Sequence, residues 1–258
     1  MQVDNQTEMI KNNKKNISKQ IIMKDLEIVI LAAGKGSRMK TETPKLLNKI
    51  NGKSLIEHTI NNAQKIKNAK INIIINKDLE ILKKKYKQIK FIKQNKAQGT
   101  GHAVKVYLRQ TKKLSNILIM MGDAPFISII DIKKVLKQLK NNALVVLGSK
   151  MQKNLGNGLI ILKDNFIKEI KEFKLNNKKD SNSHFYNTGI FGVRKENLKL
   201  INQIRKNKKL NEFLITDLLR IAFKNKIKSK LIKTYKNKIS FGINTFDELK
   251  KIKNVNKI

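Results

Sequence analysis

The chain has 258 residues, of which 40% are hydrophobic, so it is long and apolar enough for one large α/β domain with its own core. It has no cysteine, which excludes disulfides, thiolate metal sites and a cysteine nucleophile. No apolar run approaches the ~18 residues of a membrane-spanning helix, and residues 1–24 lack the apolar core of a secretory signal. We therefore expect a cytoplasmic protein without a membrane partner.

The formal net charge is +38, from 57 Lys and Arg against 19 Asp and Glu. Such a charge is compatible with nucleic-acid binding, because Lys and Arg neutralise phosphates. However, the basic residues are spread along the whole chain, and there is no Trp and few other aromatic residues on which bases could stack. This pattern favours a drift in composition over a nucleic-acid partner, and we expect the charge to attract small anionic substrates.

Polar, aperiodic residues occupy positions 1–24, which are predicted to form a disordered extension. From Leu26 the sequence alternates between β-branched runs and segments whose apolar residues have helical spacing. Strands are predicted at 27–31, 71–75, 90–93, 116–121 and 143–148, and helices at 54–67, 78–86, 101–110 and 130–140, with Asp78 as an N-cap. The alternation predicts an α/β fold with a doubly wound, mostly parallel, Rossmann-like sheet.

The regular alternation of predicted strands and helices ends after Lys150. Strands are predicted at 158–162, 167–173 and 184–193, followed by helices at 196–205, 216–224 and 245–253. We interpret residues 25–150 as one half of a single domain, residues 151–245 as an extension of the same sheet, and residues 246–258 as a C-terminal helical segment.

A glycine-rich loop follows the first predicted strand, in the run Leu31-Ala32-Ala33-Gly34 that continues to Arg38 and is followed by Pro44-Lys45. Backbone N–H groups of such a loop can face phosphate oxygens, and its small residues let a flat base approach closely. Arg38 offers a fork for phosphates and Lys45 offers a point charge. The spacing matches neither a Walker loop nor the dinucleotide fingerprint, and the alternative is a plain strand-to-helix turn.

A second segment, residues 94–103, follows a predicted strand and opens a helix. Gln94 can pair with a base edge through one acceptor and one donor, while Gly99 and Thr100 present backbone and hydroxyl groups to the base. The alternative is a loop in which Thr100 caps the helix. His102 is interpreted as a structural residue.

A carboxylate, Asp123, follows the apolar run that ends at Met121 and Gly122. Ligands of open α/β sheets bind at the carboxyl ends of the strands, and a carboxylate beside a triphosphate is a typical Mg²⁺ ligand. Asp123 is therefore a candidate magnesium ligand, with an Asp that begins a turn as the alternative. Further candidates lie in the second half, where each is ordinary turn chemistry when taken singly: Gly158, Glu172, Asn187 and Asn244.

Taken together, these motifs make the chain similar to a known family. From about Leu26 to Leu249 it resembles the uridylyltransferase domain of the bacterial bifunctional N-acetylglucosamine-1-phosphate uridylyltransferase/glucosamine-1-phosphate acetyltransferase. The most specific pieces are the Leu-Ala-Ala-Gly run with Pro44-Lys45, and Gln94 with residues 99–103. The segments that add to the likeness are Gly122-Asp123-Ala124-Pro125, Asn187-Thr188-Gly189 and Ile215-Thr216-Asp217.

The resemblance implies a fold of the nucleotide-sugar (nucleotidyl) transferase type. It also implies an Mg²⁺-dependent transfer of UMP from UTP to N-acetyl-α-D-glucosamine 1-phosphate, which gives UDP-N-acetylglucosamine and pyrophosphate for peptidoglycan and lipopolysaccharide precursors. Residues 25–150 would bind the nucleotide and residues 151–245 the sugar. The implied catalytic residues are Arg38, Lys45 and Asp123, and the implied metal ligands are Asp123 and Asn244. The implied substrate-binding residues are Leu31, Ala32, Ala33, Gly34, Lys45, Gln94, Gly99, Thr100, Met121, Gly122, Asp123, Gly158, Glu172, Asn187 and Asn244.

The chain departs from the family pattern in three places. The Tyr that usually precedes Gly-Asp is Met121 here, and the Arg that usually follows the Gly-x-Gly of the second half is Leu159. The sequence also contains no hexapeptide repeats of the family's acetyltransferase domain. We therefore expect neither acetyl transfer nor the trimer that this β-helical domain builds.

Two alternatives to this function stay open. The Leu-Ala-Ala-Gly run is shared with cytidylyl-, guanylyl- and thymidylyltransferases, so the chain could act on another pair of nucleotide and sugar phosphate. The other alternative is a basic, non-catalytic binding protein on the same fold. Suitable residues at all the phosphate and metal positions favour an enzyme.

Overall fold

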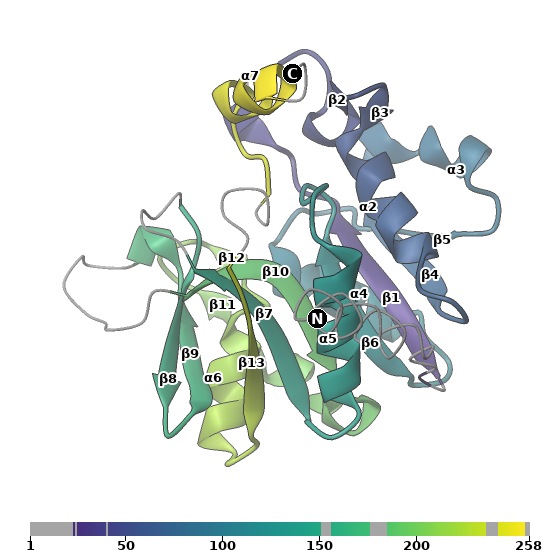
Figure 1. Ribbon diagram of the computed structural model, residues 1–258. Helices are drawn as coiled ribbons and strands as arrows, with labels where there is room; N and C mark the ends of the chain where they lie inside the picture. The colour runs from purple at the N-terminus through teal and green to yellow at the C-terminus, as the bar shows by residue number, and fades with distance from the viewer. Residues whose placement is uncertain are drawn as a thin grey trace, which may run out of the picture.

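The computed structural model describes residue 23 and residues 25–39, 41–150, 156–175, 185–235 and 242–255. In this part of the chain a nine-stranded sheet forms the centre, and helices cover both of its faces (Figure 1). The α/β, mostly parallel, Rossmann-like fold that the sequence predicts is therefore confirmed. The predicted extension over residues 1–24 lies outside the described residues except for Met23.

Seven strands cross the sheet in the order β13–β7–β10–β6–β1–β4–β5. Their bounds in chain order are β1 Leu26–Ala32, β4 Lys70–Ile75, β5 Lys90–Lys93, β6 Asn116–Met121, β7 Leu144–Lys150, β10 Phe185–Val193 and β13 Ser229–Thr234. Strand β1 is parallel to β4 and β6, whereas β10 is antiparallel to β6 and β7. The hairpin of β8 (Leu159–Lys163) and β9 (Phe166–Lys171) joins the sheet through β10.

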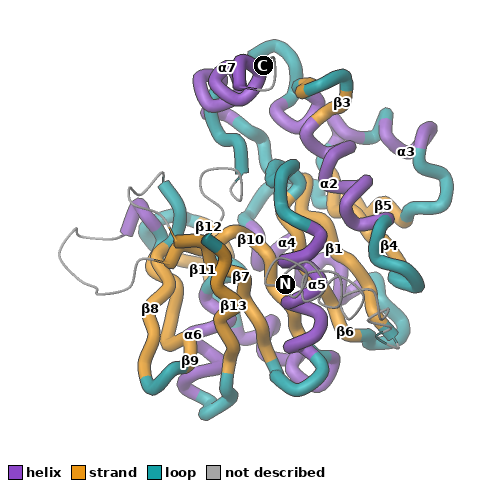
Figure 2. The backbone as a smooth tube through the Cα atoms, in the orientation of Figure 1, coloured by secondary structure: helices purple, strands orange, loops and turns teal. Residues whose placement is uncertain are grey.

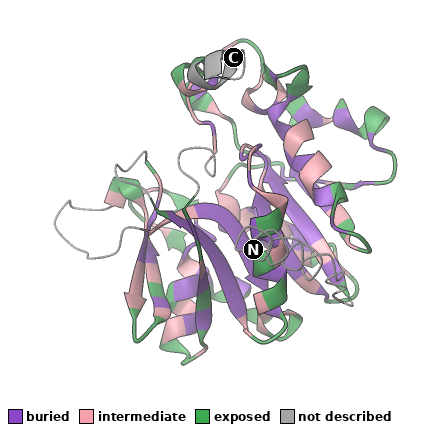
Figure 3. Ribbon diagram, in the orientation of Figure 1, coloured by how far each residue is buried: buried purple, intermediate pink, exposed green. Residues whose placement is uncertain are grey.

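The central strands are buried on both faces, which explains their continuous β-branched runs (Figure 3). In β1, Ile28 and Ile30 belong to one core cluster, while Val29 and Leu31 belong to the other. The first cluster includes side chains of α2 (Leu55–Gln64), α3 (Leu82–Lys85), α5 (Ile129–Leu139) and α7 (Phe246–Val255). The second includes side chains of α4 (Thr100–Arg109) and α6 (Asp217–Lys224), so the molecule has three layers (Figure 2).

Short elements complete the described part of the chain. Two small antiparallel pairs lie outside the main sheet: β2 Lys49–Ile50 with β3 Lys53–Ser54, and β11 Lys206–Asn207 with β12 Glu212–Phe213. The 3-10 segments are η1 Ser37–Met39, η2 Lys45–Leu47, η3 Lys77–Leu79, η4 Phe173–Leu175 and η5 Lys195–Gln203. No helix among the described residues is long and apolar enough to cross a membrane.

The prediction of a single helix over 78–86 with Asp78 as its N-cap is wrong. The segment contains η3 and the short α3, and Asn76 occupies the position before η3. The Asp78 carboxylate accepts a hydrogen bond from the Asn76 side chain (3.3 Å). Asp78 lies inside η3 and therefore cannot be the residue that precedes and caps the helix.

The segment 196–205, predicted as a helix, is the 3-10 segment η5, Lys195–Gln203. Its buried residues Leu198, Ile201 and the following Ile204 are spaced by three, and a helix with three residues per turn places them on one face. Strand β13 was not predicted. It lies at the edge of the sheet, where exposed lysines interrupt its apolar pattern.

The strand order reverses at β1, and this reversal positions the functional site. The chain passes from β1 through α2 to β4 on one side, then returns from β5 through α4 to β6 on the other side of β1. The two connecting helices therefore pack on opposite faces of the sheet. In open α/β sheets this arrangement leaves a crevice at the carboxyl ends of the two diverging strands.

Candidate active site

A cleft of about 470 Å³ lies at the carboxyl ends of β1, β5 and β6. It brings together residues from the glycine-rich loop, from the segment that opens α4, from the end of β6 and from the segment before α7. The predicted site residues that line it are Leu31, Ala32, Ala33, Gly34, Arg38, Lys45, Gln94, Gly99, Thr100, Met121, Asp123 and Asn244.

The glycine-rich loop is folded against the segment that carries Lys45. Gly36 has a φ of +63°, and a Cβ there would lie 2.4 Å from the Cβ of Lys45. Only glycine combines this backbone conformation with this close approach. Met39 is 2% exposed and anchors η1 in the core, which leaves the preceding Arg38 at the mouth of the cleft.

Four polar side chains form one cluster in the cleft. The Lys45 ammonium contacts Asp123 Oδ2 at 2.5 Å and Asn244 Oδ1 at 3.0 Å. Arg38 Nη2 donates to the same Asn244 oxygen at 3.0 Å. The cluster joins three residues that the sequence analysis proposed as catalytic with one that it proposed as a metal ligand.

The backbone around Asp123 and Asn244 holds their side chains in place. Gly122 N–H donates to Leu31 O (2.9 Å), and Ile243 N–H donates to Asp123 O (2.9 Å), so β1, β6 and the segment before α7 are tied together. Asn244 Nδ2 donates to Gly242 O at 3.0 Å, which turns Oδ1 toward the cations. A Cβ at Gly242 would lie 2.6 Å from Asp123 Oδ1, so this approach requires glycine.

The helix α7 presents Asn244 through its own N-terminal cap. Glu248 Oε2 accepts from the backbone N–H groups of Asn244 (2.6 Å) and Thr245 (3.2 Å), and Thr245 Oγ1 accepts from Glu248 N–H (3.2 Å). This reciprocal pattern is a capping box. It was not predicted, although the Thr-x-x-Glu spacing is visible in the sequence.

The oxygens of Asp123 and Asn244 fit a hard divalent cation. The Lys45 ammonium already stands where these two oxygens converge, so the pair holds a positive charge. Among the described residues, no group of three or more His, Asp or Glu side chains could hold a metal by itself. Mg²⁺ commonly takes one or two protein oxygens and completes its shell with waters and substrate phosphates. Asp123 and Asn244 suit that mode.

The segment that opens α4 forms the opposite wall. Gly99 has a φ of +96°, and a Cβ there would lie 2.5 Å from Phe213 O, so this position requires glycine. Thr100 Oγ1 accepts from Ile215 N–H at 3.0 Å and is not the helix cap, because Gly99 occupies that position. The hydroxyl therefore ties α4 to the segment that follows β12.

Gln94 differs from the expectation that it offers both an acceptor and a donor to a base. Its Nε2 is already used within the protein, by His102 Nδ1 at 2.7 Å and by Gly99 O at 3.4 Å. The donor side of the amide is therefore turned away from a ligand.

The predicted sugar-binding residues lie together on the extension of the sheet. Asn187 N–H donates to Gly158 O at 2.8 Å, and a Cβ at Gly158 would lie 3.7 Å from Glu172 Oε2. Burial raises the pKa of Glu172, while a hydrogen bond from Thr216 at 2.6 Å opposes that rise. Gly158, Glu172 and Asn187 do not line the cleft itself. Glu172 and Thr216 line a neighbouring hollow of about 370 Å³.

The two substituted family positions have packing roles. Leu159 is 5% exposed in β8 and belongs to the interior. Met121 packs against Gly189, where a Cβ would lie 2.4 Å from its Cγ. Gly189 N–H in turn donates to Asn187 Oδ1 (2.9 Å), so Met121 links the cleft to the predicted sugar residues.

Three charged residues of the cleft were not predicted as site residues: Lys35 in the glycine-rich loop, Lys174 and Glu212. Lys174 comes from η4 and Glu212 from β12, two short elements that have no periodic pattern. The signal for Lys174 was its position two residues after the predicted Glu172. Glu212 lies beside Phe213, which was not a candidate residue and gave no such signal.

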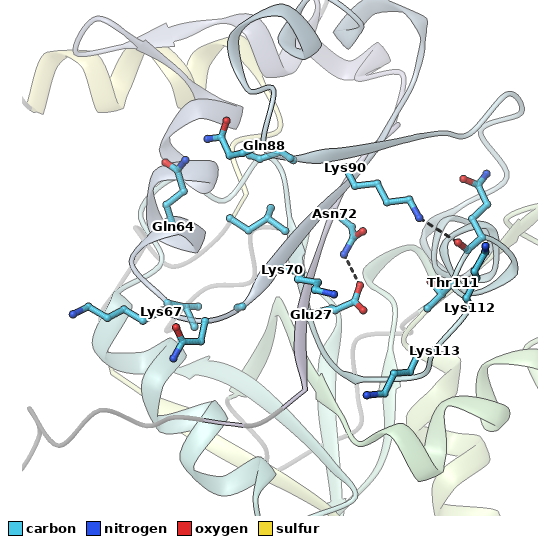
Figure 4. A pocket seen from close by; sticks show the side chains of 16 residues that line it. Glu27, Gln64, Lys67, Lys70, Asn72, Gln88, Lys90, Thr111, Lys112 and Lys113 are labelled. Carbon is cyan, nitrogen blue, oxygen red and sulfur yellow. Dashed lines mark hydrogen bonds between the residues drawn. The ribbon is translucent and has the colours of Figure 1, made fainter.

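A larger hollow of about 770 Å³, here called the amino-edge hollow, lies at the opposite ends of β1, β4 and β5 (Figure 4). It contains Glu27, whose carboxylate accepts hydrogen bonds from Asn72 (2.8 Å), Tyr107 (2.9 Å) and Ser115 (3.2 Å). Burial raises the pKa of Tyr107, and the neighbouring Glu27 raises it further. The Glu27 carboxylate thus has a structural role, because three side chains of the protein already donate hydrogen bonds to it.

Comparison with known proteins agrees with the geometry of the cleft. The family model described as a MobA-like NTP transferase domain matches residues 28–188. Bifunctional protein GlmU of Buchnera aphidicola subsp. Baizongia pistaciae is 39% identical over 227 residues, which are 87% of this chain and 51% of that protein. The protein of the same name from Wigglesworthia glossinidia brevipalpis is 33% identical over 251 residues, 92% of this chain and 53% of that protein. The chain spans about half the length of the curated relatives it matches.

Solved structures with the same fold include two pyrophosphorylases. UDP-glucose pyrophosphorylase complexed with UDP-glucose has a TM-score of 0.70 at 17% identity, covering 90% of this chain and 98% of that one. A nucleoside-diphosphate-sugar pyrophosphorylase from Vibrio cholerae RC9 has a TM-score of 0.71 at 16% identity, covering 88% and 99%. These identities show the fold alone. The family model, in contrast, covers more than half of the sequence, and the chain therefore belongs to the MobA-like NTP transferase domain family and is a nucleotidyltransferase domain.

Proposed function

We propose that this chain transfers UMP from UTP to N-acetyl-α-D-glucosamine 1-phosphate, which gives UDP-N-acetylglucosamine and pyrophosphate for cell-wall precursor synthesis. The observation that carries the proposal is the cluster in which the Lys45 ammonium lies between Asp123 and Asn244, beside Arg38. The relatives named bifunctional protein GlmU support the choice among nucleotidyltransferases, since their similarity covers most of this chain.

The nucleotide would lie across the carboxyl ends of β1 and β5. The small residues Ala32 and Ala33 line this wall and let a base and ribose approach the backbone. Arg38 and Lys45 would contact the phosphates, because they are the cationic side chains of the polar cluster. The net charge of +38 would raise the local concentration of both anionic substrates.

Asp123 and Asn244 would hold Mg²⁺ when the substrates bind, which requires the Lys45 ammonium to leave their oxygens. The bound ion would neutralise charge on the phosphates of the two reactants. Lys45 would then be free to contact a phosphate. The same side chain would thus stabilise Asp123 before binding and the substrate afterwards.

The chemistry is a phosphoryl-group substitution. A phosphate oxygen of the sugar 1-phosphate forms a bond to the α-phosphorus of UTP, and the bond from that phosphorus to the β-phosphate bridging oxygen breaks. Pyrophosphate leaves with the electron pair. Because the nucleophile is already an anion, no general base is required, and the side chains act by positioning and by charge stabilisation.

The sugar would bind on the extension formed by β8, β9 and β10. Gly158, Glu172 and Asn187 lie together there, and the contact from Met121 to Gly189 joins them to the cleft. A half-buried carboxylate and an amide are suitable partners for the hydroxyl and acetamido groups of the sugar.

The proposal is tested by measuring pyrophosphate release from the purified protein with UTP, N-acetylglucosamine 1-phosphate and Mg²⁺. CTP, GTP and dTTP serve as nucleotide controls, and glucosamine 1-phosphate and glucose 1-phosphate serve as sugar controls. We expect release with UTP and the acetylated sugar only. Release with another pair would move the specificity to that pair, and absence of release with every pair would overturn the proposal.

A further inference from the structure

We propose that His102 is the positioning residue that makes the cleft select a uracil base, because it fixes the Gln94 amide so that only its oxygen faces the nucleotide. The inference rests on the proposed function, since it concerns the base that the cleft accepts. It assigns a specificity role to a residue that the sequence analysis interpreted as structural.

The orientation of the Gln94 amide follows from its two neighbours. Gln94 directly follows β5, is only 5% exposed and lines the cleft. Its Nε2 lies 3.4 Å from Gly99 O, and a carbonyl oxygen can only accept a hydrogen bond. The amide atom on this side must therefore be the nitrogen, which directs Oε1 to the other side.

The same nitrogen fixes the protonation of His102. Nε2 of Gln94 lies 2.7 Å from His102 Nδ1, so Nδ1 must carry a lone pair and the ring proton must be on its Nε2. Burial, with Arg109 and Lys105 nearby, lowers the pKa of His102 and keeps the ring neutral at pH 7. The Phe213 ring, 6.0 Å away between centroids, packs beside it.

These contacts leave only the side-chain oxygen of Gln94 available to a ligand. Both donor directions of Nε2 are taken by His102 and Gly99. Within the described part of the chain, no group donates a hydrogen bond to Oε1 of Gln94. A buried side chain in the wall of the cleft thus presents a lone acceptor to whatever base binds there.

A lone acceptor beside backbone donors matches the imide edge of uracil. The first N–H groups of α4, at Thr100 and the residues after it, have no partner within the helix, and Gly99 and Thr100 line the same wall. Uracil offers an N3–H donor flanked by carbonyl acceptors, which pairs with both kinds of group. Cytosine offers a lone pair at N3 and an amino group in place of one carbonyl, so an acceptor would meet an acceptor and a donor would meet a donor.

Removal of the His102 acceptor would release the Gln94 amide. The remaining 3.4 Å contact to Gly99 is long for a hydrogen bond, so the amide could rotate and present Nε2 to cytosine. His102 thereby acts on the base only through Gln94. Loss of its ring would change the choice between UTP and CTP more than it changes the rate with UTP.

The test measures kcat/KM with UTP and with CTP for the wild type, His102→Leu, His102→Asn and the control His58→Leu. The Asn side chain can place an oxygen where His102 Nδ1 lies, so it should restore the preference. His58 is a half-buried histidine whose ring contacts Ile50 O (2.9 Å) and does not line the cleft, which makes it a matched control. Thermal unfolding of each variant shows whether it is folded.

We expect His102→Leu to lower the ratio of kcat/KM for UTP over CTP by at least about tenfold. His102→Asn should keep most of the ratio, and His58→Leu should leave it unchanged. An unchanged ratio in folded His102→Leu, or an equal fall in His58→Leu, would overturn the inference. A wild type that turns over no nucleotide would instead overturn the proposed function. If His102→Leu does not fold, His102→Ser takes its place. The ratio of kcat/KM for UTP over CTP should then be lower in His102→Ser than in His102→Asn, and equal ratios would overturn the inference.

Discussion

The two hollows at opposite edges of the sheet each contain a carboxylate, but the carboxylates have different kinds of partner. At the amino edge, Glu27 accepts from Asn72 in β4, Tyr107 in α4 and Ser115 directly before β6, three neutral donors. At the carboxyl edge, Asp123 faces the Lys45 ammonium at the end of a long, rotatable side chain. The three donors to Glu27 are buried, whereas the side chains of Lys45 and Asp123 are 11% and 23% exposed.

The difference separates a structural carboxylate from one that can exchange partners. The three donors to Glu27 are buried, so breaking one of these hydrogen bonds would leave a buried donor unpaired, and the fold keeps these partners together. A lysine can leave Asp123 when another cation arrives, because both the ammonium and the carboxylate can reach water. We therefore expect the reaction in the cleft at the carboxyl edge, although the amino-edge hollow is larger.

The largest effect is expected from Asp123→Ala, which should lower kcat by about 10³-fold while the fold survives. A metal ion supplies several kcal/mol of charge stabilisation, and about 1.4 kcal/mol corresponds to a factor of ten in rate. Pyrophosphate release and thermal unfolding should be measured together. Near-normal turnover in this variant would remove Asp123 from the metal site.

Lys45→Ala should lower kcat by about 10²-fold, which is the usual cost of losing one charge-stabilising group. It should also raise the affinity of the free protein for Mn²⁺, because the competing ammonium no longer occupies the Asp123 and Asn244 oxygens. Titration calorimetry without nucleotide measures that affinity independently of turnover. Weaker Mn²⁺ binding in the variant would contradict the exchange of partners at Asp123.

Arg38→Ala should lower turnover by about tenfold and should change the KM for the sugar phosphate less. Arg38 contacts Asn244 at the mouth of the cleft rather than the predicted sugar residues. One charge-assisted hydrogen bond is worth roughly 1.5–3 kcal/mol. Arg194→Ala, which removes a surface ion pair with Glu196, is the control and should leave both constants unchanged.

Glu27→Gln should leave kcat unchanged and should lower the free energy of unfolding by about 1–3 kcal/mol. The amide nitrogen of the variant would face at least one of the three donors, so a buried donor would lose its acceptor. Denaturant unfolding measures the loss. A fall in turnover without a fall in stability would give the amino-edge hollow a part in the reaction.

The smallest effect concerns Glu57, in the capping box of α2. Burial alone would raise its pKa, but hydrogen bonds from Lys85 and Ser54 outweigh burial and lower the pKa from 4.5 to about 2. The ionised group therefore stabilises the fold at neutral pH, and this contribution disappears as the pH falls from about 4.5 toward 2. Glu57→Gln should cost about 1 kcal/mol at pH 7.

Unfolding of the wild type and Glu57→Gln at a series of pH values tests the direction of this pKa shift. The two should differ at pH 7 and converge at acid pH. A difference that grows on acidification would contradict the lowered pKa. The exposed Glu80, paired with Lys93 at the surface, is the control, and Glu80→Gln should behave as the wild type.

Local pattern was enough to predict the buried strands of the sheet but not every element. The runs in β1, β4 and β6 are buried on both faces, and such strands have continuous apolar sequences. Strand β13 is an edge strand with exposed lysines, and η5 depends on packing of Leu198 and Ile201 with a period of three. Tertiary contacts decide these two elements, and residue patterns carry little of that information.

The candidate site shows the same division. The glycine-rich loop and Asp123 follow buried strands, so their place at the carboxyl edge could be predicted from strand order alone. The use of Gln94 Nε2 by His102 could not, because it depends on the geometry of a single turn. Nor could Glu212, which reaches the cleft from a strand of two residues.

The position of Asn244 near the end of the sequence has a consequence for the synthesis of the protein on the ribosome. Its oxygen completes the cluster with Lys45, yet the two residues are 199 positions apart. A nascent chain therefore exposes the glycine-rich loop and Asp123 long before the segment that precedes α7 emerges. The cleft therefore gains its full set of polar groups only when translation has passed Asn244.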